Sequence, residues 1–207
     1  MIAAPAPASW SAPPAGLEAA TNRVDVWWLR AGETVAARAA LRELLGRYLA
    51  IPPASVRLHV SAHGKPELDP VHASDLRFSL SHSDGVALAA VRRGHAVGVD
   101  VERIRPDVDC DAVAGAIFPQ SLRIAWHSAI GAGRRAAFFG AWVRFEALAK
   151  AGGQGIASAE PLRGSERFGC RELPAPEGFA AAVASEGSAW SLACLRAGEA
   201  SRASHTA

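Results

Sequence analysis

Asp100 and Glu102 lie two residues apart in the segment 96–103, where valine occupies every second position from 97 to 101. Such alternation is typical of a β-strand, so both carboxylates are expected to project from one face of a sheet. Two like charges on one face oppose folding unless a cation lies between them. Paired carboxylate oxygens suit Mg²⁺ shared with a phosphate-bearing substrate. The alternative interpretation is a strand that ends in solvent beside Arg103 and Arg105.

A third carboxylate, Glu146, precedes Lys150 by four residues in the segment 134–151. Large apolar residues recur in this segment at helical spacing, and the pair Gly152–Gly153 supplies a stop signal. The predicted helix presents Glu146 and Lys150 on one face, beside an apolar stripe. Taken alone, the two residues form an ordinary exposed ion pair worth about 0.3–0.5 kcal/mol.

The elements that must position these side chains follow from the pattern of hydrophobicity. Apolar runs predict strands, periodic segments rich in alanine and leucine predict helices, and turn residues such as Ser81–Gly85 predict connections. Strands are predicted at 23–29, 56–60, 76–81, 86–91, 96–103, 179–183 and 190–195, and helices at 34–50, 113–118 and 134–151. Together they indicate an α+β protein.

A weak internal repeat accompanies these elements. Segments 86–103 and 179–196 align without gaps, and five of the 18 positions are identical. Three of the five are alanines in a chain rich in alanine, so a chance match is the alternative. A genuine repeat predicts two similar α/β lobes. The second copy has Ala193 and Leu195 in place of Asp100 and Glu102, so a single metal site is expected.

Composition excludes several classes of protein. The 207 residues include 22 basic and 20 acidic side chains, a net charge of +2, which argues against a nucleic-acid partner. The three cysteines are far apart and form no CxxC pair, so we expect reduced thiols in a cytoplasmic protein. No apolar stretch reaches the ~18 residues of a membrane helix, and residues 1–14 lack the features of a signal peptide. Residues 1–22, rich in alanine and proline, are expected to be a disordered lead, and residues 198–207 a flexible tail.

Four motifs in one order carry a resemblance to a known family. They are Gly64–Pro66, Phe78–Ser83, Gly98–Glu102, and Trp142–Ala151 with the Gly-x-Gly that follows it, Gly153–Gly155. In this order they resemble the phosphopantetheinyl transferases, in particular the two-lobed monomeric type that activates fatty-acid, polyketide and peptide synthetases. The resemblance implies two pseudo-symmetric α/β lobes, expected at 23–105 and 106–197, with the active site between them.

The resemblance also implies roles for the acidic residues. Asp100, Glu102 and Glu146 would hold Mg²⁺, which bridges the pyrophosphate of coenzyme A. A serine of an apo acyl or peptidyl carrier protein would attack the phosphate next to pantetheine and release adenosine 3′,5′-bisphosphate. In such phosphoryl transfer, positioning and charge neutralisation supply most of the catalysis. Glu146, or a water that it orients, is the candidate base, and Lys150 would meet the phosphate charge.

By the same resemblance, Arg42, Lys65, Ser81 and His82 are expected to hold the nucleotide end of coenzyme A, including its 3′-phosphate. Arginine suits that task because its planar guanidinium donates two hydrogen bonds at once. Each residue has a structural alternative. Arg42 could belong to a solvated helix face, Lys65 could decorate a Gly-x-Pro turn, and His82 could be a hydrogen-bonded loop residue.

The chain departs from the family pattern at three places. Phe145 stands where the family has lysine, so a cation near the phosphates is missing, and Arg144 is rotated by ~100° from that position. Phe145→Lys is expected to raise turnover if the missing charge limits it. Ser121 stands where many members have glutamate, and the segment 28–34 is shorter than in many relatives. Weakened binding of coenzyme A is therefore expected.

The sequence thus predicts a Mg²⁺-dependent transferase that uses coenzyme A and an apo carrier protein. A catalytically weakened member that binds coenzyme A or a carrier as a regulator or scaffold is the first alternative. The second is a different Mg²⁺ enzyme acting on a nucleotide or phosphate ester. Transfer to a carrier, observed as a gain in mass, distinguishes the prediction from both alternatives.

Overall fold

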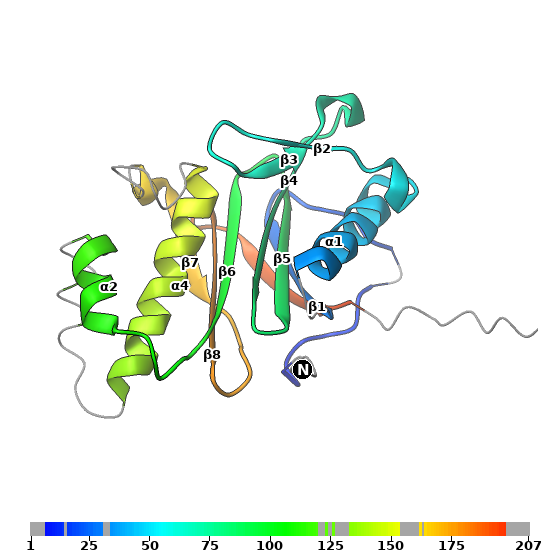
Figure 1. Ribbon diagram of the computed structural model, residues 1–207. Helices are drawn as coiled ribbons and strands as arrows, with labels where there is room; N and C mark the ends of the chain where they lie inside the picture. Colours follow the sequence, from blue (N-terminus) through cyan, green and yellow to red (C-terminus); the bar gives the residue numbers. More distant parts are fainter. Residues whose placement is uncertain are drawn as a thin grey trace, which may run out of the picture.

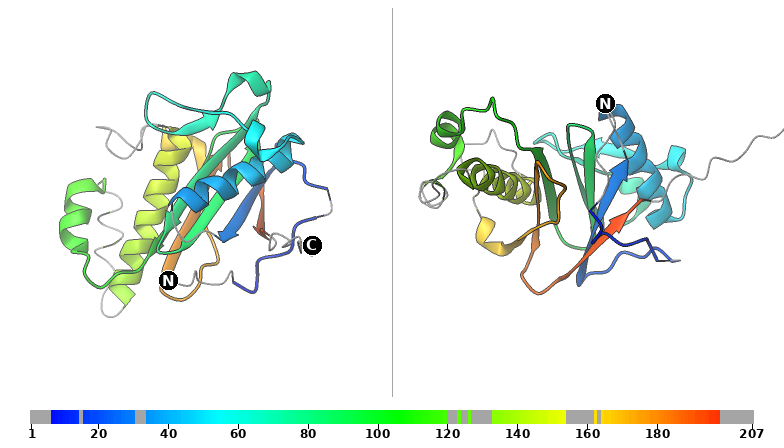
Figure 2. Two further views of the ribbon diagram at one scale, coloured as in Figure 1. Left: turned by 45° about the vertical axis from the view of Figure 1, so that its right-hand side comes forward. Right: turned by 90° about the horizontal axis from the view of Figure 1, so that it is seen from below.

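The computed structural model describes residues 7–14, 16–30, 34–119, 123, 126, 133–153, 162 and 164–197. This part of the chain forms two main β-sheets packed face to face, and a helix covers the outer face of each (Figures 1 and 2). The succession of layers is helix, sheet, sheet, helix. The predicted α+β class is confirmed.

The first sheet has the strand order β4-β5-β1-β9. Its strands are β4 (Leu76–Ser83), β5 (Val86–Arg93), β1 (Arg23–Arg30) and β9 (Ser191–Arg196). β1 pairs antiparallel with β5 and parallel with β9. Helix α1 (Thr34–Leu49) covers the outer face because its leucines recur every three or four residues and pack on the sheet.

The second sheet has the order β6-β8-β7. Its strands are β6 (Val97–Arg103), β8 (Phe179–Glu186) and β7 (Phe168–Glu172). Helix α4 (Arg134–Gly152) covers its outer face, and α2 (Cys110–Ile117) packs beside α4. The two segments of the internal repeat coincide with β5–β6 and β8–β9, and each begins in one sheet and ends in the other. The first sheet therefore includes β9 from the predicted second lobe, and the second sheet includes β6 from the predicted first lobe. The lobe boundaries stay a prediction.

The inner core lies between the two sheets. Alternate residues of β1, β5, β6 and β8 point into it, which buries a large apolar surface and holds the sheets together. Its larger members are Trp10, Val24, Val26, Trp28, Val86, Leu88, Val97, Val99, Val101, Leu173, Phe179, Val183 and Trp190. Trp27 and Leu29 of β1 pack instead in the cluster that contains the apolar residues of α1, so this part of β1 is buried on both faces.

The N-terminal segment differs from the prediction. Trp10 is 1% exposed, packs edge-to-face on Trp28 and donates a hydrogen bond from Nε1 to Pro174 O at 3.0 Å. Ser11 forms an isolated bridge with Leu195 of β9. The predicted disorder of residues 1–22 is therefore wrong for 7–14 and 16–22. The prediction depended on the proline content of the segment and did not consider the apolar area that Trp10 buries. The predicted tail at 198–207 lies outside the described residues.

The hairpin between β4 and β5 also differs from the prediction. β4 continues through Ser83, and only Asp84 and Gly85 form the turn, with φ of 45° and 83°. Two-residue hairpin turns require left-handed backbone at both positions, which Asp-Gly adopts readily. Ser83, which lies in the predicted turn, is therefore a strand residue, and Ser81 lies within the strand rather than at its end.

Smaller elements complete the fold. The sequence analysis missed the partner strand of the short hairpin β2 (Leu58–Val60) and β3 (Pro66–Leu68), and it missed β7. Short 3₁₀ turns occur at Pro53–Ser55, Pro70–His72 and Ser165–Arg167. All three cysteines are free. Within the described ranges, every helix is too short or too polar to cross a membrane.

Candidate active site

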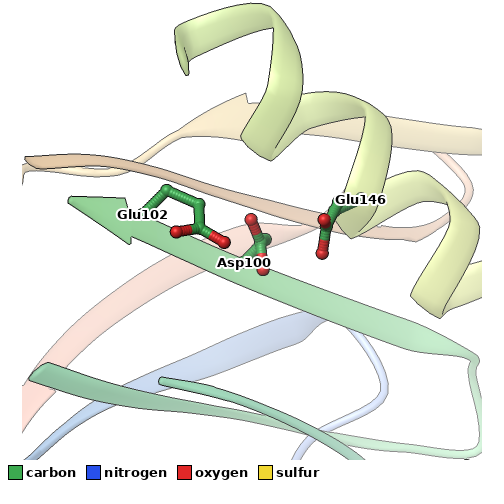
Figure 3. A group of neighbouring side chains, drawn as sticks. All are labelled: Asp100, Glu102 and Glu146. Atoms are coloured by element: carbon green, nitrogen blue, oxygen red, sulfur yellow. The ribbon is translucent and has the colours of Figure 1, made fainter. Parts of the chain in front are cut away.

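Three carboxylates converge where β6 faces α4. Asp100 and Glu102 project from β6 and Glu146 from α4 (Figure 3), and one carboxylate oxygen from each of the three lies within 4.8 Å of the other two. Asp100 is 1% exposed and Glu146 is 7% exposed. The structure thus brings together the three residues that the sequence analysis proposed as metal ligands.

Gly98 allows the helix to approach the strand this closely. It lies on the same face of β6 as Asp100, two residues earlier. A Cβ atom at this position would be 2.1 Å from Ala147 O and 2.4 Å from Ala151 N, both backbone atoms of α4. Because only glycine leaves room for that backbone, Gly98 sets the distance between the two elements that carry the carboxylates.

Lys150 completes the acidic cluster. Its Nζ donates to Asp100 Oδ1 at 2.6 Å and to Ser81 Oγ at 3.1 Å, and it lies 3.5 Å from Glu146 Oε2. Burial alone would lower the pKa of Lys150, but the adjacent Asp100 and Glu146 carboxylates raise it above its ordinary value. Lys150 is therefore a charged ammonium that balances part of the negative charge. Glu146 and Lys150 thus lie side by side, but the pair is not the exposed one of the alternative interpretation, because Glu146 is buried and the shorter contact of Lys150 is with Asp100.

The carboxylates carry more negative charge than Lys150 balances. Burial, reinforced by repulsion from Asp100, raises the pKa of Glu146 to about 7 and also raises the pKa of Glu102. In addition, Asp100 Oδ2 is buried and has no hydrogen-bond partner in the described part of the chain. A buried carboxylate oxygen without a partner is costly.

A divalent cation fits this site. Mg²⁺ binds oxygen ligands at about 2.1 Å, so ligands on opposite sides of one ion are about 4.2 Å apart. The spacing of the three carboxylates is close to that span, and Asp100 Oδ2 would gain the partner that it lacks. Asp100, Glu102 and Glu146 are the residues that would hold the ion.

A cavity of about 310 Å³ opens beside the cluster. Basic and polar side chains from separate elements line it, among them Arg38, Lys65, His82 and Lys150. Arg42 is exposed on α1 and is not among the lining residues, whereas Arg38, one turn earlier, is. The sequence analysis named Arg42 from the basic face of α1. It could not show that Arg38 is the residue that lines this cavity, because the tilt of a helix over a sheet is not encoded in its periodicity. A role for Arg42 stays a prediction.

Lys65 has a second task in addition to lining the cavity. Its Nζ donates to Val97 O of β6 at 3.0 Å and to Lys150 O of α4 at 2.7 Å. The second bond satisfies a carbonyl in the last turn of α4, where intrahelical donors are missing. Burial lowers the pKa of Lys65 to about 8. Lys65 thus joins the strand and the helix that carry the carboxylates.

The departure at Phe145 has a structural explanation. Phe145 is 0% exposed and packs among Phe118, Phe138 and Trp142. Arg144 is exposed and lies 3.8 Å from Glu172 of β7, so it does not replace the missing cation. Ser121, residues 31–33 of the short segment 28–34, and two residues of the Gly-x-Gly motif, 154 and 155, lie outside the described residues.

Comparisons with known proteins identify the family of the chain. Residues 96–200 match the family model described as 4′-phosphopantetheinyl transferase superfamily. The chain is also similar to the 4′-phosphopantetheinyl transferase HetI of Nostoc sp., with 37% identity over 129 residues. That alignment covers 61% of the chain and 54% of the relative, so the chain matches about half of the relative's length. The range 96–200 includes the three carboxylates and Lys150, whereas Lys65 and His82 precede it.

Proposed function

The chain belongs to the 4′-phosphopantetheinyl transferase superfamily, and on this premise we propose that it transfers the phosphopantetheine arm of coenzyme A to a serine of an apo carrier protein. The observation that carries the proposal is the convergence of three carboxylates and a lysine beside a cavity lined by cations. Such a site suits a substrate with two separate centres of phosphate charge. Coenzyme A has both, a pyrophosphate and a 3′-phosphate.

Each part of the site has a role in this reaction. Asp100, Glu102 and Glu146 would hold Mg²⁺, which when bound neutralises charge on the pyrophosphate. Lys150 is fixed by Asp100 and Ser81, so its charge is held in place before substrate arrives. Preorganised charge of this kind needs no rearrangement during the reaction.

Glu146 is the candidate proton acceptor for the carrier serine. In the metal-free site burial raises the pKa of Glu146 to about 7, and a bound Mg²⁺ would lower it, so in the loaded site Glu146 would be a charged carboxylate able to accept a proton. Its carboxylate, or a water that it orients, would accept the hydroxyl proton as the serine oxygen attacks phosphorus. The bond to the leaving phosphate then breaks, and adenosine 3′,5′-bisphosphate departs.

The cavity beside Lys150 would hold the nucleotide end of coenzyme A. Arg38, Lys65 and His82 supply positive or donor groups there. We include Arg38 in this role because it lines the cavity, and we retain Arg42, which lies one turn away, as a peripheral contact for phosphate. A cytoplasmic location and a monomeric state remain part of the proposal, as does an apo acyl or peptidyl carrier protein as the acceptor.

The test is an incubation of the purified chain with Mg²⁺, coenzyme A and a panel of apo carrier proteins, measured by intact mass. The proposal predicts the gain of one phosphopantetheine on a carrier, and loss of that gain in Asp100→Asn. Glu172→Gln, an exposed carboxylate on β7, is the matched control and should retain transfer. Calorimetric binding of coenzyme A without transfer to any carrier would instead support a regulator or scaffold. Phe145 in place of the family lysine is the observation that favours this second candidate.

A further inference from the structure

Three serines of β4 bind the backbone of β6 at a constant interval. The three hydroxyl oxygens each accept a hydrogen bond from a backbone N–H that lies 20 residues later in the chain. The bonds join Ser79 to Val99 at 3.1 Å, Ser81 to Val101 at 3.4 Å and Ser83 to Arg103 at 3.1 Å. We call these three residues the serine ladder.

The serine ladder joins the edges of two sheets. β4 is the edge of the first sheet and β6 is the edge of the second, and the two strands lie side by side (Figure 1). An edge strand has backbone groups without ladder partners, and buried groups of this kind require hydrogen bonds. The three serine hydroxyls supply hydrogen-bond acceptors for the N–H groups of β6. The ladder thereby fixes the position of β6 along β4.

Two members of the ladder also contact the carboxylates. Ser81 Oγ donates to Asp100 Oδ1 at 2.7 Å, and Ser83 Oγ donates to Glu102 Oε2 at 2.9 Å. A hydroxyl has one hydrogen to donate, so each serine restrains one oxygen of its carboxylate and leaves the other available. Ser79 has no such partner because the corresponding position of β6 is Gly98.

We propose that Ser83 is a positioning residue for the metal ligand Glu102, as Ser81 is for Asp100. The Glu102 side chain has three rotatable bonds and is only half-buried, so without Ser83 its carboxylate samples several rotamers. The bond from Ser83 selects one of them before the ion binds. Loss of such an outer partner typically weakens metal binding 10–100-fold. The inference depends on the proposed function only in taking Mg²⁺ as the ion.

The test compares two serines that differ in one bond. Ser83→Ala removes the donor to Glu102 and the acceptor for the Arg103 N–H, whereas Ser79→Ala removes only an acceptor for a backbone N–H. Both variants should unfold at lower urea concentration. Ser83→Ala should also bind Mg²⁺ about tenfold more weakly, while Ser79→Ala binds it as the unaltered chain does. The measurement is the shift in Tm on titration with Mg²⁺, without coenzyme A or carrier, confirmed by calorimetry.

Further variants make the test independent of stability. Ser83→Thr keeps the hydroxyl and should restore Mg²⁺ affinity. Ser83→Cys keeps the size of the side chain but donates weakly, so it should show the loss even if Ser83→Ala is too unstable to titrate. Equal Mg²⁺ affinities in the Ser83 and Ser79 variants would overturn the proposal and leave the ladder a purely structural device. An unaltered chain with no response to Mg²⁺ would overturn it too, and would identify the metal site itself as the error.

Discussion

Glu146→Gln should change how the stability of the metal-free protein depends on pH. In the folded chain, burial and the Asp100 charge raise the pKa of Glu146 to about 7, whereas in the unfolded chain a glutamate titrates near 4.3. A carboxyl group with a raised pKa stabilises the folded state fully below its unfolded pKa. That stabilisation is lost as the pH rises through the folded pKa.

The magnitude follows from the two pKa values. One pKa unit corresponds to 1.36 kcal/mol, so Glu146 lowers the free energy of unfolding by roughly 2 to 3 kcal/mol between pH 5 and pH 7.5. Glu102, whose pKa is also raised, adds a contribution of the same sign. Lys65 interferes little, because burial lowers its pKa only to about 8 and most of its titration therefore lies above this range.

The assay is urea unfolding in the presence of a chelator at half-unit steps from pH 5 to pH 7.5. The unaltered chain should lose stability steadily over this range, and Glu146→Gln should lose much less because glutamine does not titrate. Saturating Mg²⁺ should remove most of the loss in the unaltered chain, since the ion binds the charged carboxylates. Parallel pH profiles for the two proteins would refute the assignment of a raised pKa to Glu146.

Three further substitutions test the packing that holds the site. Phe145→Lys would place a charge inside the aromatic cluster of α4, so the structure predicts a loss of stability in place of the raised turnover expected from the sequence. The free energy of unfolding in urea should fall by about 3 kcal/mol or more. A stable variant with faster turnover would show that the lysine reaches the phosphates. Gly98→Ala must displace α4 because its Cβ would overlap backbone atoms of Ala147 and Ala151. We expect the free energy of unfolding to fall by about 1–3 kcal/mol and Mg²⁺ to bind more weakly in calorimetry. Unaltered Mg²⁺ affinity would contradict this account of the helix position. Trp10→Ala should lower stability by about 3–5 kcal/mol, and an unchanged Tm would mean that the N-terminal segment does not pack in solution.

The acidic cluster could be predicted in part because its members follow short-range periodicities. The two-residue period of a strand places Asp100 and Glu102 on one face, and the helical period places Glu146 beside Lys150. That these two pairs meet could not be derived from either period. It depends on the packing of α4 against β6, which the resemblance to a family supplied and Gly98 explains.

The contacts that were missed depend on register between distant strands. Ser79, Ser81 and Ser83 alternate in the sequence, but the predicted strand ends at Ser81 and the predicted turn begins there, so Ser83 falls in the turn. The Asp84–Gly85 pair, which favours a two-residue turn, is the signal that would have extended the strand. The bond from Lys65 to the end of α4 spans 85 residues, so no local pattern could have indicated it.

The central claim is that one divalent ion binds between Asp100, Glu102 and Glu146. A crystal of the protein soaked in Mn²⁺ and measured at the manganese absorption edge tests it most directly, because anomalous scattering identifies the ion by position and by element. The account predicts one strong peak within coordination distance of all three carboxylates. Absence of a peak there in a protein that transfers phosphopantetheine, or a peak at other residues, would contradict it.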